Sequence, residues 1–379
     1  MFPFRTFLRA GVFARVLPAV LLGPGIAAAQ AQLDRVIVTG TREPQPLSQS
    51  AADVVVIDAA TIRDSAADSV EDLLRIEAGI QLARNGGPGQ TSGYFVRGAS
   101  TNGTVVLIDG VIVGSASLGQ ASFDALTLDQ IDHIEVLRGP ASSLYGANAV
   151  GGVIQIFTRR GDGPPRPTAH LAGGRYRPYL GSAGISGSQG GFDYAAMIGR
   201  EASGGVSAVR PNDRFGNSNP DDDGYGRNFG NLKLGYTPAA GHRIGVNVVA
   251  SELDARYDGA DFNPPDYLPD ASPDFRNHLR STIVAIDYSG VISPYWTTTL
   301  QGAQNFDDAK GGGATLSEFK TRREQLLWQN ALRWSADQQL MLAYEYLREQ
   351  VSGDIFSVQP RRNNNGFVAG YAGRFGAAG

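Results

Sequence analysis

Residues 134–156 read IEVLRGPASSLYGANAVGGVIQI, and this stretch decides the fold of the region around it. Val136 and its neighbours form a short apolar run, which predicts a strand. Pro140 suits the first turn of a helix, where the N–H that proline lacks is not needed. We expect this short helix to end at Gly151-Gly152, because glycine is a common helix stop. Val153–Phe157 then predicts a second buried strand, so the stretch predicts a strand–helix–strand unit.

The chain divides into two regions with different sequence patterns. Residues 34–163 read as one compact α/β unit. In residues 164–379, segments of roughly ten residues alternate between apolar and polar side chains, as strands with two different faces do. One segment places Leu232, Leu234 and Tyr236 on one face, and similar segments are found at 244–250, 284–288, 326–334 and 340–346. Two long polar connections are expected at 201–227 and 253–277.

Apolar residues outside and polar residues inside are the pattern of a transmembrane β-barrel. Aromatic residues near the segment ends, such as Tyr236, Trp296 and Trp334, favour a barrel because rings settle at the membrane interface. The alternative is a soluble β-sandwich with one wet face. Residues 164–379 have room for about ten strands. A barrel of ten strands could not enclose the α/β unit of residues 34–163, whereas barrels whose lumen is filled by such a folded unit have about 22 strands. We therefore expect about half of a 22-stranded barrel and a truncated chain.

The N-terminal residues 1–31 predict a secretory signal peptide. Arg5, Arg9 and Arg15 precede the apolar run 16–22, and Ala29-Gln30-Ala31 fits a cleavage site. The run is shorter than the ~20 residues of a transmembrane helix. The net charge is −4 without a basic block, which argues against nucleic-acid binding. The chain has no cysteine, and its four histidines lack metal-ligand spacing, which argues against zinc.

Several motifs resemble the plug domain of TonB-dependent outer-membrane transporters. The stretch 134–156 resembles the end of that domain, and Phe95–Gly98 and Val106–Val111 resemble its central strands. Within the latter, Asp109-Gly110 predicts a hairpin turn. Ser69–Ile76 predicts a helix capped by Ser69. The resemblance implies an α+β plug domain at 41–163, antiparallel transmembrane β-barrel strands at 164–379, and a place among the lipids of a Gram-negative outer membrane.

The start of the predicted mature chain, residues 32–40, resembles a TonB box. Its extended, β-branched character suits strand addition to a partner, which the resemblance identifies as a TonB-type energy-coupling protein. An ordinary first strand is the alternative. The residues assigned to the box are Asp34, Arg35, Val36, Ile37, Val38 and Thr39.

The resemblance also implies roles for plug side chains. Arg97 and Arg138 are expected to lock the plug to the barrel through carboxylates; solvated surface arginines are the alternative. The loops 85–92 and 114–120 are expected to form the floor of the ligand pocket, although simple turn chemistry explains their composition equally well. The expected substrate-binding residues in these loops are Gln90, Ser92 and Ser115.

Within the family, Asn85–Gln90 and its spacing to Phe95–Gly98 resemble the cobalamin (vitamin B12) receptor branch. Four aspartates fall where that branch places calcium ligands, and Ca²⁺ prefers six to eight oxygen ligands. Bound calcium would order the two long connections; the alternative is acidic, solvated loops. One aspartate of the pattern, near Gly204-Gly205, lacks a counterpart, and Asp261 or Asp266 would have to replace it. The expected ligands are Asp221, Asp223, Asp258 and Asp274.

The expected function is TonB-dependent active import of cobalamin or a related corrinoid. A ferric siderophore or haem importer of the same family is the alternative. A sensor that relays ligand binding is disfavoured, because only about two residues separate the predicted cleavage site from Asp34. An enzyme is disfavoured because the sequence has no G-x-G-x-x-G, P-loop, nucleophile-elbow or H-E-x-x-H motif.

Overall fold

The computed structural model describes most of the chain between residues 36 and 373. Residues 35–379 form one compact unit. None of the helices in the described part is both long and apolar enough to cross a membrane. The described ranges are 36–37, 39–40, 42, 44–84, 92–116, 119, 121–174, 177–207, 209–210, 213, 221–259, 262–263, 268–269, 274–313, 315–335, 338–354 and 360–373.

The plug is an α+β unit built on a five-stranded sheet of order β3-β8-β9-β6-β7, in which only β6 and β9 pair in parallel. Two-stranded ladders β1–β2 and β4–β5 accompany it. Its elements are β1 (Val36–Ile37), β2 (Gln45–Pro46), η1 (Leu47–Gln49), β3 (Val54–Ile57), α1 (Ala59–Asp64), α2 (Val70–Ala78), β4 (Gln81–Arg84), β5 (Ser92–Phe95), η2 (Thr101–Gly103), β6 (Thr104–Ile108), β7 (Val111–Ile112), η3 (Phe123–Ala125), η4 (Leu128–Gln130), β8 (Ile131–Arg138), α3 (Ser142–Tyr145) and β9 (Gly152–Thr158).

The plug core forms where apolar residues of α2 meet the sheet. Leu73 and Leu74 of α2 share one buried cluster with Ile134 of β8 and Ile154 of β9. Ser69 caps α2 by accepting a hydrogen bond from the Asp72 backbone N at 3.1 Å, as the sequence predicts. The strands expected around Val136 and at Val153–Phe157 are confirmed as β8 and β9.

The expected end of the helix at Gly151-Gly152 is wrong. Helix α3 is a single turn that ends at Gly146, whose φ of 85° breaks the helix first. Pro140 lies two residues before α3 rather than in its first turn. Gly151 and Gly152 serve close packing instead: a Cβ on Gly151 would lie 2.5 Å from the Ala99 Cβ, and one on Gly152 would lie 2.3 Å from the Leu137 carbonyl oxygen.

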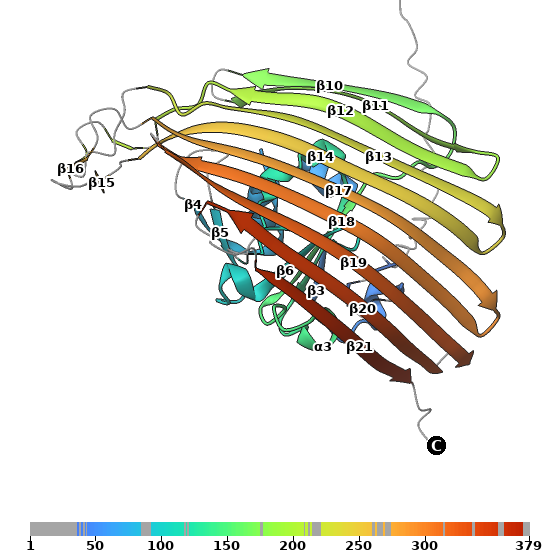
Figure 1. Cartoon of the computed structure of the whole chain (residues 1–379). Helices are drawn as coiled ribbons and strands as arrows, with labels where there is room; N and C mark the ends of the chain where they lie inside the picture. Colours follow the sequence, from blue (N-terminus) through green and yellow to red (C-terminus); the bar gives the residue numbers. More distant parts are fainter. Residues whose placement is uncertain are drawn as a thin grey trace, which may run out of the picture. The chain divides into compact units, whose positions relative to one another are not determined.

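The rest of the described chain forms a curved antiparallel sheet of ten strands, which we call the wall (Figure 1). Each wall strand pairs with its neighbour in chain order, and β15 and β16 pair separately in the connection between β14 and β17. The elements are β10 (Arg166–Gly174), β11 (Arg177–Gln189), β12 (Phe192–Ser203), β13 (Tyr225–Ala239), β14 (His242–Asp258), β15 (Phe262–Asn263), β16 (Leu268–Pro269), β17 (Asp274–Ser293), β18 (Trp296–Gly312), β19 (Leu316–Ser335), β20 (Gln338–Gly353) and β21 (Arg361–Gly373).

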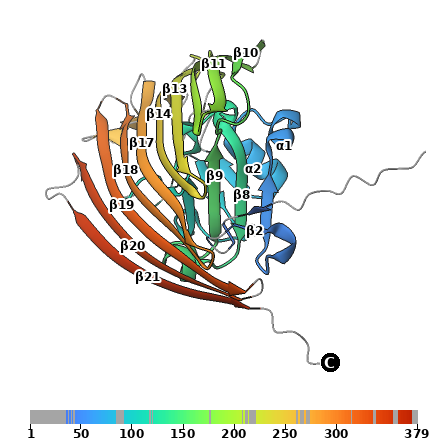
Figure 2. The same ribbon diagram turned by 90° about the vertical axis from the view of Figure 1, so that its right-hand side faces the viewer.

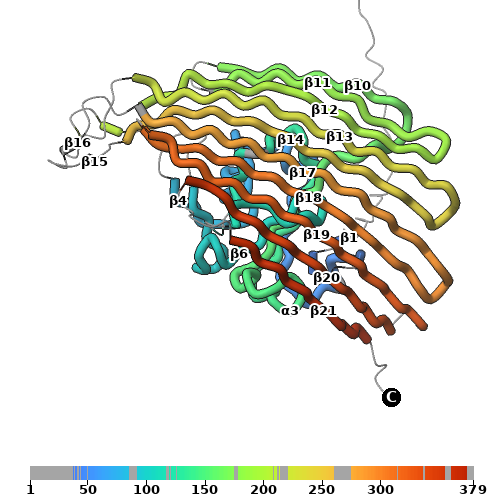
Figure 3. The backbone as a smooth tube through the Cα atoms, viewed as in Figure 1, coloured from blue at the N-terminus to red at the C-terminus, as the bar shows by residue number. Residues whose placement is uncertain are grey.

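The wall has an apolar outer face and a polar inner face, as the alternation predicts. Ile244 and Ile286 on the outer face are 46% and 58% exposed, whereas Asn231 and Asn247 on the inner face are 6% and 3% exposed. The concave inner face lies against the plug (Figure 2), and the strands run obliquely past one another (Figure 3). The plug followed by barrel strands, with only part of a barrel present, confirms the predicted fold class.

The two long connections are shorter than predicted. Strands β12 and β13 pair as far as Ser203 and Tyr225, and β14 and β17 pair as far as Asp258 and Asp274. The connections are therefore 204–224 and 259–273. Ladder hydrogen bonds use only backbone groups, so the polar side chains at these strand ends do not stop the pairing.

Candidate functional site

Thr39, the last residue of the predicted TonB box, is buried in the plug and held by three side chains. Its backbone N donates to Glu135 Oε2 at 2.7 Å, and its hydroxyl donates to Gln155 Oε1 at 3.1 Å. The Tyr145 hydroxyl donates to the Thr39 carbonyl oxygen at 3.1 Å. These partners come from β8, β9 and α3, so the strand–helix–strand unit binds the N-terminal segment. We call these four residues the Thr39 cluster.

The rest of the predicted box is described only in part. Val36 and Ile37 form β1, which pairs with Gln45 and Pro46 of β2, and the Ile37 side chain is fully buried. Asp34, Arg35 and Val38 lie outside the described residues. The described part of the segment is therefore docked on the plug.

His133 lies between the carboxylates of Asp132 and Glu135. His133 stacks on Phe157 with ring centroids 4.3 Å apart; its Nδ1 lies 2.7 Å from Asp132 Oδ2 and its Nε2 lies 3.6 Å from Glu135 Oε1. Burial lowers the pKa of His133, but its hydrogen bonds with Asp132 and Glu135 outweigh burial and raise the pKa to about 9. An imidazolium at neutral pH therefore favours the ionised form of Glu135, which accepts from Thr39.

Arg42, three residues after Thr39, reaches the wall. Its Nη2 lies 3.0 Å from Glu345 Oε2 of β20, and its guanidinium lies over the Tyr145 ring, 4.5 Å from the centroid. Gln329 Nε2 of β19 donates to the Arg42 carbonyl oxygen at 2.6 Å. The segment thus contacts both the plug and the wall within four residues, 39–42.

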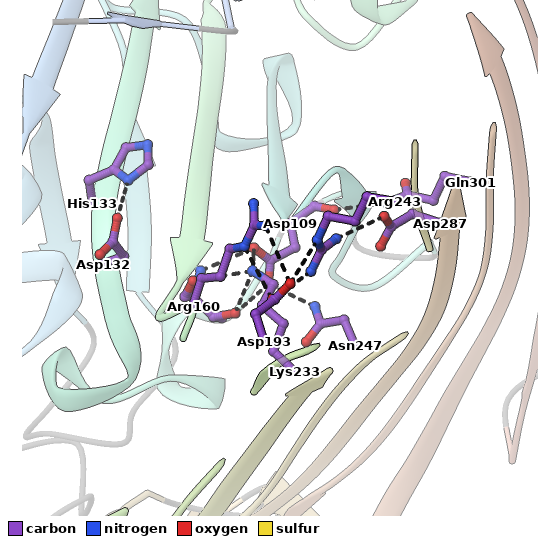
Figure 4. A network of polar contacts seen from close by, with 11 residues as sticks. Asp109, Asp132, His133, Arg160, Asp193, Lys233, Arg243, Asn247, Asp287 and Gln301 are labelled. Atoms are coloured by element: carbon purple, nitrogen blue, oxygen red, sulfur yellow. Dashed lines mark hydrogen bonds and ion pairs between the residues drawn. The ribbon is translucent and has the colours of Figure 1, made fainter. Parts of the chain in front are cut away.

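The Asp109-Gly110 turn between β6 and β7 is a second contact with the wall (Figure 4). The Asp109 carboxylate accepts from Lys233 Nζ of β13 at 2.6 Å and from Asn247 Nδ2 of β14 at 2.7 Å. Gln301 Nε2 of β18 donates to the Asp109 carbonyl oxygen at 3.0 Å. The sequence predicts this turn correctly but gives no sign that it binds the wall.

The chain that follows the turn runs along β19. Gln325 Nε2 donates to the Gly110 carbonyl oxygen at 3.1 Å, and Gln325 Oε1 accepts from the Ile112 backbone N at 3.1 Å. Arg323 then donates to the Gly114 carbonyl oxygen, and Thr321 Oγ1 accepts from the Ala116 backbone N at 3.1 Å. Alternate inner-face residues of one strand thus bind successive plug residues, and we call residues 109–116 the anchor segment. The sequence indicates these contacts only by the polar residues at every second position of β19.

A further charged group joins the end of the plug to the wall (Figure 4). Arg160 Nε lies 3.2 Å from Asp193 Oδ1 of β12, and Arg243 Nη2 of β14 lies 2.8 Å from the same oxygen. Arg243 Nη1 also lies 3.4 Å from Asp287 Oδ2 of β17. This group links the exit of the plug to three wall strands.

The two predicted lock arginines lie together, but on a plug residue. Arg138 Nη2 lies 2.8 Å from Asp53 Oδ1, and Arg97 Nη2 contacts Asp53 Oδ2. The hydrogen bond from Arg138 is the main cause that lowers the pKa of Asp53. Their predicted pairing with barrel carboxylates remains a prediction.

Of the predicted substrate residues, Ser92 and Ser115 line one cavity of about 130 Å³ between plug and wall, together with Asp124, Asn277 and others. Ser92 donates to Glu71 Oε1 of α2. Burial, and secondly the nearby Glu71 charge, raise the pKa of Asp124 to about 6. Gln90 lies outside the described residues. The lining of the cavity is mostly apolar, and Ser92, Ser115 and Asp124 add hydroxyl and carboxyl groups that a ligand could contact.

The predicted calcium aspartates lie at neighbouring strand ends. Asp258 ends β14 opposite Asp274 of β17, and Asp258 Oδ2 accepts from Ser207 Oγ at 2.8 Å. Asp223 is buried just before β13, and Asp221 is half-buried. Among the described side chains no group of three or more His, Asp or Glu is arranged to hold a metal ion. The stand-in residues Asp261 and Asp266 lie outside the described part.

Comparison with known proteins agrees with this architecture. Residues 46–153 match the TonB-dependent receptor plug domain. Residues 46–153 are thus a TonB-dependent receptor plug domain, and the wall strands follow it in the chain. TonB-dependent receptors are a class of receptors and transporters rather than enzymes, in agreement with the prediction.

The similar curated proteins are vitamin B12 transporters. BtuB of Vibrio cholerae is 40% identical over 126 residues, which are 33% of this chain and 21% of that protein. BtuB of Photobacterium profundum is 28% identical over 341 residues, which are 88% of this chain and 53% of that protein. The chain therefore spans about half or less of these relatives.

Among solved structures, the siderophore receptor PirA of Acinetobacter baumannii has a TM-score of 0.61 at 17% identity. The match covers 81% of this chain and 49% of that one. At this identity the likeness concerns the fold alone.

Proposed function

We propose that the protein imports cobalamin or a related corrinoid across the outer membrane, driven by a TonB-type energy-coupling protein. The observation that carries the proposal is the likeness to vitamin B12 transporters over 88% of the chain. The same proposal includes cleavage of the signal peptide at 1–31 on export and insertion of the protein in the outer membrane. A plug on a wall with an apolar outer face supports it.

The proposed point of energy input is the segment 34–39. Strand β1 pairs with β2 over two described residues, and its extended backbone suits addition to a partner strand. The inner-membrane potential supplies ~2.3 kcal/mol per charge per 100 mV. A few protons therefore suffice to break the Thr39 cluster, whereas unfolding a whole domain takes roughly 5–15 kcal/mol. We therefore propose that the partner displaces part of the plug and leaves the rest folded.

The ligand is tested by direct binding. Cyanocobalamin and a panel of ferric siderophores and haem are titrated into the purified protein in detergent. Binding of cyanocobalamin alone supports the proposal, whereas binding of a siderophore or of haem favours the second candidate function. That candidate has its own support in the fold shared with siderophore receptors. Ser92→Ala and Ser115→Ala should weaken binding of the true ligand, while Ser65→Ala, which lines neither of the two cavities that Ser115 lines, serves as control.

We also propose that Asp221, Asp223, Asp258 and Asp274 bind a structural calcium ion with the ends of the two long connections. The pairing of Asp258 with Asp274 across the ladder supports this. Calcium should protect residues 201–277 from proteolysis, and the double variant Asp223→Asn, Asp258→Asn should abolish that protection. Equal cleavage with calcium and with chelator would refute the site.

A further inference from the structure

One of the apolar areas on the inner face of the wall packs against the plug core. Val249, Ile283, Ala285 and Ala303 are each at most 7% exposed and belong to the same buried cluster as the plug core. They are contiguous, because Val249 pairs with Ile283 and Ala285 pairs with Ala303 in the ladders. Burial of apolar side chains from both partners excludes water from this place.

Polar side chains surround this area, and they bind the anchor segment. Asn247 pairs directly with Ala285, and Gln301 lies two residues from Ala303 on β18, opposite Asp287. From the plug, Ile108 and Val111, which flank the Asp109-Gly110 turn, belong to the apolar cluster. An apolar centre with a hydrogen-bonded rim is the arrangement of the strongest parts of protein interfaces.

The backbone of the Asp109-Gly110 turn fits closely against the wall. Asp109 has a φ of 48°, which aspartate tolerates better than most residues. Its side chain is only 9% exposed, and Thr158 fixes it from within the plug by donating from Oγ1 to Oδ2 at 2.5 Å and from its backbone N to Oδ1 at 3.1 Å. Gly110 has a φ of 84°, and a Cβ there would lie 3.2 Å from Gln301 Oε1. A larger residue would push the turn away from β18.

The Thr39 cluster offers a contrast within the same plug. It holds one residue of a short segment by hydrogen bonds, and β1 adds a ladder of two described residues. The anchor segment is bound by side chains of β13, β14, β18 and β19 and adjoins the apolar area. A pull on the N-terminus therefore acts on the Thr39 cluster before it reaches the anchor segment.

We propose that residues 109–116 are a fixed anchor, which stays on the wall and holds the Gly114–Ala116 loop in place while the N-terminal part of the plug is displaced. The proposal rests on the proposed import function. It assigns Asp109 as a positioning residue: it keeps Ser115, on the ligand side of the plug, in a constant position relative to β19.

The chain lacks cysteine, so paired cysteines can be introduced cleanly. The variant Ala116→Cys, Thr321→Cys joins the anchor segment to β19 at a contact of 3.1 Å. The control variant Thr39→Cys, Gln155→Cys joins the N-terminal segment to β9, also at a contact of 3.1 Å. Both are bridged by a short, reducible bifunctional thiosulfonate in the full chain, in outer membranes of a strain without its own cobalamin receptor, and cyanocobalamin uptake is measured before and after reduction.

We expect the bridge at 116–321 to leave uptake unchanged and the bridge at 39–155 to abolish it until reductant is added. Loss of uptake on bridging 116–321, restored by reductant, would overturn the anchor. If the cysteine-free parent takes up no ligand at all, the proposed import function is refuted. The anchor proposal is then tested by a second measurement that does not depend on uptake.

That second measurement is hydrogen exchange of the full chain in lipid bilayers. The amides of Ile112 and Ala116 donate to wall side chains, so we expect them to exchange much more slowly than the Thr39 amide. Gln325→Ala should accelerate exchange at Ile112 and leave Thr39 unaffected. Exchange at Ile112 and Ala116 as fast as at Thr39 would contradict a fixed anchor.

Discussion

Release of the N-terminal segment should depend on the three side chains around Thr39. The perturbations are Tyr145→Phe, which removes one neutral hydrogen bond, and Glu135→Gln, which replaces a charge-assisted hydrogen bond by a neutral one. The first is worth about 1 kcal/mol, and the second lowers a contribution of about 1.5–3 kcal/mol to about 1 kcal/mol. One to two kcal/mol changes an equilibrium by a factor of about 5–30, so each variant should raise the undocked population by that order.

The assay uses the fully buried Ile37 as a reporter. In an Ile37→Cys background, a thiol reagent reacts only when the segment leaves the plug, so the labelling rate follows the undocked population. We expect roughly fivefold faster labelling in Tyr145→Phe and an increase of similar size in Glu135→Gln. The two effects should not add, because both side chains bind Thr39.

Tyr94→Phe is the matched control. It removes another buried phenol, whose oxygen accepts from the Ala121 backbone N at 3.1 Å, far from the Thr39 cluster in the sequence. Labelling of Ile37→Cys should not change in this variant. If Tyr145→Phe and Glu135→Gln label no faster than the parent, these contacts do not hold the segment and the reasoning is refuted.

Three more predictions follow from other contacts. Gly110→Ala and Gly98→Ala both place an alanine at positive φ, which costs roughly 1–2 kcal/mol. Only the alanine at 110 would contact Gln301. Urea unfolding should therefore show a free energy of unfolding about 1 kcal/mol lower for Gly110→Ala than for Gly98→Ala. The folded-state pKa of His133 is raised, so its contribution to stability is complete below about pH 6.5 and is lost as pH rises through about 9; unfolding of His133→Asn should lack this dependence, and an equal dependence would contradict it. Ile286→Arg on the outer face should cost roughly 2–4 kcal/mol near the bilayer midplane and reduce the heat-modifiable folded form on gels, whereas a soluble sheet would tolerate it.

Much of the fold could be predicted from local patterns. Period-two alternation predicts the wall strands and their outer face, since Leu234 and Ile286 are exposed on one side as expected. The turn at Asp109-Gly110 and the cap at Ser69 follow from residue chemistry within a few positions. The end of α3 could not be predicted, because Gly146, Gly151 and Gly152 all suit a helix stop and tertiary packing decides among them.

The contacts of the candidate site were much harder to predict. Thr39 binds residues 96 and 116 positions away, so no local pattern reveals its partners. A signal does exist: Glu135 lies between Ile134 and Val136 of β8, Gln155 lies between Ile154 and Ile156 of β9, and buried polar groups require partners. That signal says that a partner exists but not which residue it is. The pairing of Arg97 and Arg138 with Asp53 is equally invisible before the strands are placed.

Four side chains of the wall bind the plug through the plug's main chain. Gln301, Arg323, Gln325 and Gln329 each donate to a plug carbonyl oxygen. Every amino acid supplies such an oxygen, so these four contacts discriminate backbone path rather than side-chain identity. A transplanted plug loop would therefore have to reproduce this backbone trace, in addition to the side chains of Arg42 and Asp109 that bind the wall directly.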